Sequence, residues 1–243
     1  MIEILHVHHM IITALYRAIF DNIGNILAFE TMPGYQVSHG DEFAIIKDTD
    51  PSLSVNISDS AIKSIRKVIN DLPIIKSIGV RVISITLPSP DITRQYLQLL
   101  KICIRYARCL DMNIWCEMSD VVSINKKLRN QIDDIKQCGG LISMGKFDVS
   151  NRLDLIRLHW LPYDIIKLDD AIFHLVEQGG LQYETFQKVI TKLRTLNPTI
   201  VYDCVEYPGR HLPLSPLHQA DMPGPYITSS EACPLDAWLT KLN

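Results

Sequence analysis

The sequence predicts an α/β barrel, in which parallel strands alternate with helices that cover them. Segments with the apolar spacing of amphipathic helices alternate with short apolar runs along the chain. These runs are nearly continuous, as expected for strands that are buried on both faces. The chain has 243 residues, close to the length of one such barrel. Element count and length therefore favour a barrel over the other option, a doubly wound sheet.

The first half of the chain supplies the first strand–helix alternations. A strand is expected at 25–30, where turn residues precede an apolar run. The next helix is expected from about Asp59, with Ser58 as its N-cap and Pro73 as its stop. The further elements predicted in this half are strand 80–87, helix 91–109, strand 113–117 and helix 124–137.

The second half repeats the pattern after a stop at Gly139-Gly140. No repeat, low-complexity segment or Gly/Ser linker interrupts it, so residues 1–243 are expected to form a single domain. The elements predicted here are strands 141–144, 164–168 and 199–205 and helices 152–159 and 186–196.

Composition argues against several kinds of partner. A formal net charge of -3 gives no general attraction to nucleic acid or anionic lipid. No apolar run approaches the roughly 20 residues of a membrane helix. The 6 cysteines show no Cys-x-x-Cys pair, which favours reduced thiols, with Cys103, Cys109 and Cys116 in the core. We therefore expect a cytoplasmic protein without direct nucleic-acid or membrane binding.

Short segments from about residue 15 onward follow one another in a characteristic order. They are 16–21 (compare QPI), Glu30-Thr31-Met32 (EAL), 83–88 (VNLS), 117–120 (E-x-T-E), 142–148 (ALDDFG), 166–169 (IKID), 201–206 (VAEGVE) and 223–226 (QGY). In order and spacing they resemble the EAL domain of cyclic-di-GMP phosphodiesterases, although no single segment is intact.

The resemblance implies a (β/α)8 TIM-like barrel of the EAL type with an unusual first strand and a site at the strand ends. It also implies phosphodiester hydrolysis assisted by two divalent cations, which need several oxygen ligands. The residues that match the family's site are Glu30, Glu117, Lys167 and Glu206. The residues that depart from it are Thr86 in place of Asn, Gly145 and Lys146 in place of two Asp, and Pro223 in place of Gln.

These departures predict that the hydrolytic site is lost. Gly145 has no side-chain ligand, and Lys146 has only donors and a positive charge. We expect no metal site, no cofactor and no catalytic activity, with the matching residues retained as a buried charge network. Two arrangements of Lys146 stay open: its ammonium pairs with Glu30 or Glu117, or it points to solvent.

The leading functional hypothesis is a non-enzymatic regulator that binds another protein, as degenerate stand-alone EAL proteins do. By this resemblance the partner is a transcription regulator of motility, adhesion or virulence, and a homodimer is expected by analogy. The alternative is an inactive cyclic-di-GMP receptor, against which the lack of an Arg after Glu30-Thr31-Met32 counts. An active phosphodiesterase comes third. Two interpretations of the proline-rich segment Tyr207–Pro216 stay open: a partner-binding surface, or sequence drift at a site no longer under catalytic demand.

Overall fold

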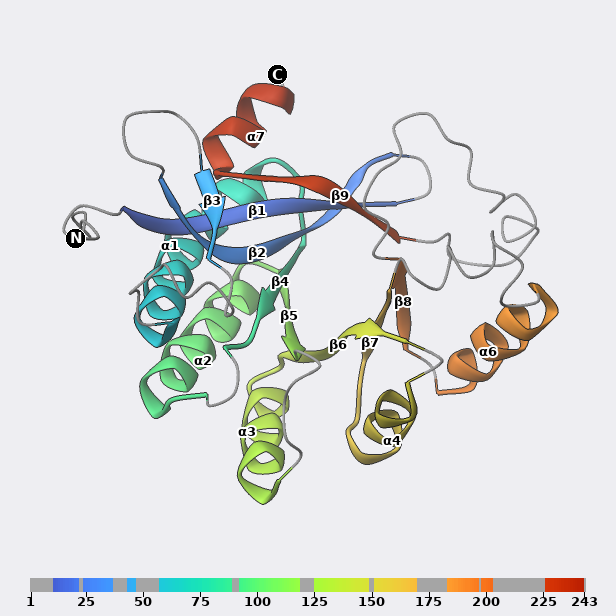
Figure 1. Ribbon diagram of the computed structural model, residues 1–243. Coiled ribbons are helices and arrows are strands. Elements are labelled where there is room, and N and C mark those ends of the chain that lie inside the picture. The colour runs from blue at the N-terminus through green and yellow to red at the C-terminus, as the bar shows by residue number, and fades with distance from the viewer. Residues whose placement is uncertain are drawn as a thin grey trace, which may run out of the picture.

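A nine-stranded sheet that curls into a barrel forms the centre of the computed structural model (Figure 1). The structure describes residues 11–21, 24–36, 43–46, 57–88, 92–118, 125–148, 151–169, 183–196, 198–202 and 226–242. The strand order is β1-β9-β8-β7-β6-β5-β4-β2-β3. The strands are β1 (Ile12–Phe20), β2 (Ile26–Gln36), β3 (Phe43–Ile45), β4 (Val82–Thr86), β5 (Asn113–Met118), β6 (Leu141–Phe147), β7 (Ile165–Leu168), β8 (Thr199–Tyr202) and β9 (Tyr226–Cys233).

Strand β1 closes the barrel. It pairs antiparallel with β2 on one edge and with β9 on the other, so eight strands form a ring from which β3 projects. From β2 through β4 to β9 the neighbouring strands of the ring are parallel. This topology confirms the expected barrel and its unusual first strand.

Helices cover the outside of the barrel, and several begin at polar caps. The side-chain oxygens of Thr93, Asn125 and Asn151 each accept a backbone N–H from the first helical turn. No described helix is long and apolar enough to cross a membrane. The helices are α1 (Ile57–Ser77), α2 (Arg94–Cys109), α3 (Lys126–Gln137), α4 (Arg152–Trp160), α6 (Tyr183–Thr195) and α7 (Leu235–Leu242).

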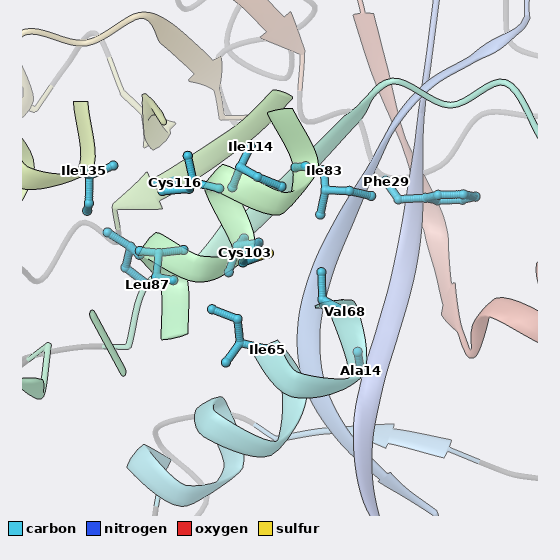
Figure 2. Close-up of a cluster of buried hydrophobic side chains, with 14 of the residues drawn as sticks. Ala14, Phe29, Ile65, Val68, Ile83, Leu87, Cys103, Ile114, Cys116 and Ile135 are labelled. Carbon is cyan, nitrogen blue, oxygen red and sulfur yellow. The ribbon is translucent and has the colours of Figure 1, made fainter. Parts of the chain in front are cut away.

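The main hydrophobic core lies between the barrel and the helices on its first half. Ile65 and Val68 of α1 and Cys103 of α2 face strand residues such as Ile83 and Ile114 (Figure 2). All five are fully buried or nearly so. Burial of such side chains contributes roughly 1.5–3 kcal/mol each relative to exposure, so this layer fixes the strands on which the site is built.

Helix α1 departs from its expected bounds. It begins at Ile57, so Ser58 lies inside its first turn, and it continues through Pro73 to Ser77. Pro73 is exposed, whereas Leu72 and Ile75 are fully buried. Packing of these neighbours offsets the hydrogen bond that proline cannot donate, so the expected stop at Pro73 was wrong.

Two of the three cysteines expected in the core are buried. Cys103 and Cys116 are buried free thiols, and burial raises the pKa of the Cys103 thiol to about 12. Cys109, expected in the core, is exposed because it falls on the outer face of the last turn of α2. The apolar neighbours of Cys109 in the sequence therefore gave a wrong prediction.

Candidate functional site

Polar side chains form a layer inside the barrel. The strand registers pair Glu30 with Ser84, Thr86 with Glu117, and Glu117 with Ser143. Register partners point to the same side of a sheet, as do residues two positions apart on one strand. These side chains therefore share the inward face. An apolar layer lies beside them and consists of Ile19, Ala28, Val82, Trp115, Ile165 and Val201.

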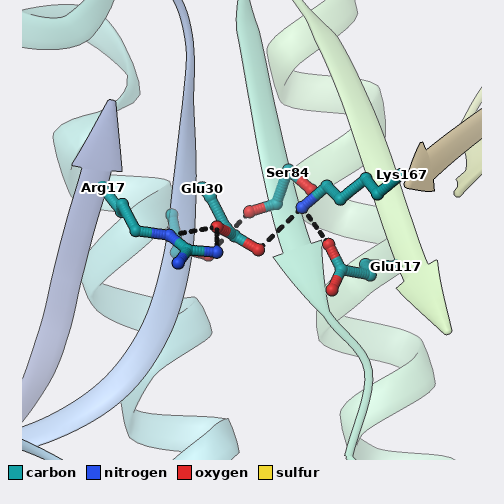
Figure 3. Close-up of polar contacts among 6 residues, drawn as sticks. Arg17, Glu30, Ser84, Glu117 and Lys167 are labelled. Atoms are coloured by element: carbon teal, nitrogen blue, oxygen red, sulfur yellow. Dashed lines mark hydrogen bonds and ion pairs between the residues drawn. The ribbon is translucent and has the colours of Figure 1, made fainter. Parts of the chain in front are cut away.

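Lys167 of β7 lies between two carboxylates (Figure 3). Its Nζ donates a hydrogen bond to Glu30 Oε1 at 2.7 Å and another to Glu117 Oε2. On the other side of Glu30, Arg17 Nε donates to Oε2 at 2.6 Å. The side chains of Lys167 and Glu30 are 1% and 4% exposed, so water scarcely screens these contacts. The four side chains alternate in charge, and their formal charges cancel.

The network shifts the proton affinities of its members. Burial raises the pKa of Glu30, but the attraction of Lys167 and of Arg17 outweighs burial and lowers this pKa to about 2. Burial raises the pKa of Glu117 to about 7, with the charge of Lys167 opposing and that of Glu30 adding to the rise. Burial acts to lower the pKa of Lys167, but the two carboxylates raise it above its ordinary value. Glu30 and Lys167 therefore stay charged at neutral pH.

Gly145 of β6 leaves the space that Glu117 occupies. A Cβ atom at position 145 would lie 2.8 Å from Glu117 Oε1 and 3.2 Å from Glu117 Cγ and Cδ. A contact of 2.8 Å is too short for a carbon atom beside a carboxylate oxygen, so one of the two groups would have to move. The glycine is therefore suited to the position in which Glu117 reaches Lys167.

Lys146 belongs to a bulge between β6 and β7. The pairing register shifts between Met144 and Phe147, and Lys146 has a φ of 49°, in the left-handed region. Its side chain is exposed, while both Glu30 and Glu117 pair with Lys167. Of the two expected arrangements of Lys146, the structure has the solvent-facing one.

Three polar residues of this layer were missed from the sequence. Arg17 lies in the segment that matches QPI and is the register partner of Glu30. Ser84 and Ser143 are fully buried, and their Oγ atoms have no hydrogen-bond partner among the described residues. The two serines could have been found from the alternation of side chains along a strand. Ser84 lies two positions before Thr86, and Ser143 lies two positions before Gly145, so each serine points to the same inward face as the predicted site residue.

The structure brings together only part of the predicted set. Glu30, Glu117 and Lys167 are in direct contact, and half-buried Thr86 is the register partner of Glu117. The remaining predicted positions lie outside the described residues: Glu206, Pro223 and the segment Tyr207–Pro216.

No protein-family model matches the chain, and no curated protein matches it. Solved structures match over nearly all of it. EAL enzyme Bd1971 with cAMP and cyclic-di-GMP bound has a TM-score of 0.66 at 15% identity, covering 96% of this chain and 65% of that chain. An EAL domain protein from Listeria monocytogenes EGD-e has a TM-score of 0.64 at 16% identity, covering 95% and 92%. The Xanthomonas citri FimX EAL domain in complex with c-diGMP has a TM-score of 0.65 at 9% identity, covering 92% and 88%.

The chain has the EAL-type fold. At sequence identities this low, the similarity to the solved structures shows the fold alone. The chain spans less than two thirds of the length of the Bd1971 chain. The EAL-type barrel places Glu30, Glu117 and Lys167 on three strands of one ring, facing its interior.

The described donor set does not fit a pair of divalent cations in this EAL-type barrel. Mg²⁺ requires near-octahedral oxygen coordination, and here three of the four carboxylate oxygens of Glu30 and Glu117 accept hydrogen bonds from Lys167 or Arg17. A cation between the two carboxylates would have to displace the Lys167 ammonium. Within the described ranges, no group of three or more His, Cys, Asp or Glu side chains is placed to hold a metal ion.

Proposed function

We propose that this protein is a non-enzymatic regulator with an EAL-type barrel that acts by binding another protein. One observation is the main support for the loss of hydrolysis. Lys167 Nζ contacts both Glu30 and Glu117, and the Glu117 carboxylate lies in the space that a side chain at position 145 would need. The carboxylates are thus neutralised by cationic side chains of the protein itself.

The chemistry explains why this arrangement opposes hydrolysis. Divalent cations in such a reaction activate a water molecule and stabilise charge on the departing oxygen. Among the described residues, Lys167 and Arg17 hold the carboxylates in ion pairs, and neither cation activates water. Replacing two aspartates by Gly145 and Lys146 also removes two negative charges and adds one positive charge. The ion pairs and the lack of the two aspartates both disfavour cation binding.

The second candidate is a cyclic-di-GMP receptor that binds without cleaving. It is favoured by the fold neighbours, since Bd1971 and FimX have structures with the cyclic dinucleotide bound. The absence of an arginine after Glu30-Thr31-Met32 counts against it, because a dianionic ligand then has fewer bidentate partners for its phosphates.

Titration calorimetry with cyclic-di-GMP, with and without Mn²⁺, separates these functions. We expect no binding heat in either condition and no linear product by chromatography. Metal-independent binding would replace the proposal by the receptor function. Metal-dependent binding or turnover would overturn it in favour of an active phosphodiesterase. An EAL phosphodiesterase of known activity, treated identically, is the positive control.

The protein-binding part of the proposal needs its own test. We expect affinity purification from the source cells to yield a partner, a transcription regulator by the family resemblance, whose complex with this chain re-forms from purified components. Failure of every captured protein to re-form a complex would contradict it. A homodimer and a cytoplasmic location stay predictions, which light scattering and cell fractionation check.

A further inference from the structure

Helix α4 presents most of its apolar side chains outward and buries two charged side chains. Asp154 and Arg157 are 2% and 5% exposed. Leu153, Ile156 and Trp160, by contrast, are 66%, 49% and 55% exposed. A surface helix of a globular protein normally has the opposite arrangement, with the apolar stripe on the core. A surface helix with exposed apolar side chains and buried charged ones indicates that another molecule covers its outward face.

Contacts beneath the helix fix its orientation. Arg157 Nη1 donates to Asp154 Oδ1 at 3.2 Å, and the backbone N–H of Asp148 donates to Asp154 Oδ2 at 3.0 Å. Rotation of α4 about its axis to bury its apolar side would expose this ion pair and break the bond to Asp148. Unpairing a buried charge costs several kcal/mol, so the apolar face of α4 stays outward.

The apolar face continues into a groove between α4 and α6, which lie side by side on the second half of the barrel (Figure 1). We call it the α4–α6 groove. Its volume is about 390 Å³. Leu155 and Leu196 on its two walls are 51% and 57% exposed. The apolar side chains that line it are Phe147, Leu155, Leu158, Val189, Leu193 and Leu196.

Among the side chains that the structure describes on α4 and α6, the exposed charged ones are all basic. Lys192 lines the groove, and Arg152 and Lys188 are exposed on the two helices that form it. His159 also lines the groove. The one acidic side chain described on these two helices, Asp154, is buried and paired with Arg157.

We propose that the α4–α6 groove docks an amphipathic helix of a partner protein, with an apolar stripe flanked by acidic residues. A helix that lies in a groove between two helices presents apolar anchors at i, i+3, i+4 and i+7. Acidic flanks complement Lys192 and its basic neighbours. The proposal rests on the proposed function, a regulator that acts by protein contact, and names the surface and the chemistry of the contact.

Fluorescence anisotropy with a designed peptide tests the proposal. The probe is a labelled, stapled helix with a leucine stripe and glutamate flanks. The comparison peptide has the same leucine stripe and lysine flanks. We expect the acidic peptide to bind at least about tenfold more tightly than the basic one, a difference of about 1.4 kcal/mol. Leu155→Ser and Leu196→Ser should weaken binding, and Lys192→Glu should reduce the preference for the acidic peptide. These side chains are half-exposed or more, so the variants keep the fold.

The matched control is Ile102→Ser, which removes an apolar side chain of similar exposure, 54%, from α2. It should leave peptide binding unchanged. Equal binding of both peptides, no binding, or binding insensitive to the groove variants would overturn the proposal. Light scattering that finds a dimer dissociated by Leu155→Ser would also overturn it, because a second copy would then be the occupant.

The two proposals fail separately. Turnover of cyclic-di-GMP would show that the barrel interior is catalytic. It would overturn the proposed function whether or not the peptide binds the α4–α6 groove. Loss of peptide discrimination with no turnover would overturn only the assignment of the groove.

Discussion

Glu30 keeps its charge inside the barrel because Lys167 and Arg17 contact both of its carboxylate oxygens. Its folded pKa of about 2 lies below the ordinary value of 4.5. A depressed carboxyl pKa stabilises the folded state above the unfolded pKa, and this stabilisation is lost as pH falls toward the folded value. Glu30 thus links stability to pH in the acid range.

We therefore expect Glu30→Gln to lower the free energy of unfolding by about 3 kcal/mol at pH 7, by the linkage between pKa and stability. The difference from the wild type should shrink as pH falls from 4.5 toward 2. Urea titrations across this range measure it. A difference that stays constant with pH would show that Glu30 does not have the depressed pKa.

Gly145 and Glu117 compete for one volume, so their substitutions should be coupled. Gly145→Ala places a Cβ 2.8 Å from Glu117 Oε1 and should cost about 1–3 kcal/mol of unfolding free energy. In a Glu117→Ala background the obstructing atoms are gone, and most of this cost should disappear. A double-mutant cycle by chemical denaturation measures the coupling.

The control for this cycle is Gly79→Ala. Gly79 has a φ of 90°, and nothing lies within 4 Å of an added Cβ. Its cost comes from backbone strain and should be the same with or without Glu117. Additive effects for Gly145→Ala as well would contradict the steric explanation.

At the scale of elements, α7 is held on the barrel by buried side chains, among them Trp238. Trp238 Nε1 donates to the backbone oxygen of Tyr16 at 2.7 Å, and its ring centroid is 5.7 Å from that of Phe29. The side chain is 6% exposed. It therefore joins α7 to β1 and β2 in one core.

We expect Trp238→Ala to cost about 3–5 kcal/mol of unfolding free energy, the usual range for a buried aromatic residue. Trp160 is the matched control because it is 55% exposed, and Trp160→Ala should cost less than about 1 kcal/mol. Thermal unfolding followed by circular dichroism compares the two variants. Equal losses would mean that α7 does not stabilise the barrel.

The alternation of strands and helices was predictable because its signals are local. Helix α2 ends at Cys109 and strand β5 begins at Asn113, as expected from apolar spacing and turn residues. Strand β9 was missed, because its sequence YITSSEAC has no apolar run and its pairing with β1 depends on distant residues. Strand β3 and helix α7 were also missed, because both are short. A single domain over 1–243 stays a prediction.

Part of the site was also predictable. The motif spacing placed Glu30, Glu117 and Lys167 in one buried network, and they are in contact. The contact of Arg17 with Glu30 was not predictable, because it depends on the antiparallel register of β1 with β2, which no local sequence signal specifies. The solvent-facing position of Lys146 follows from a bulge that depends on pairing between strands.

The closure of the ring by β1 has a consequence for synthesis of the chain. β1 is made before β9, yet one of its two edges pairs with β9, and Trp238 contacts Tyr16 across 222 positions of sequence. A nascent chain on the ribosome can therefore pair β1 with β2, but the opposite edge of β1 must wait for β9 to leave the exit tunnel. During that interval β1 exposes an unpaired strand edge, the feature that promotes aggregation and recruits chaperones.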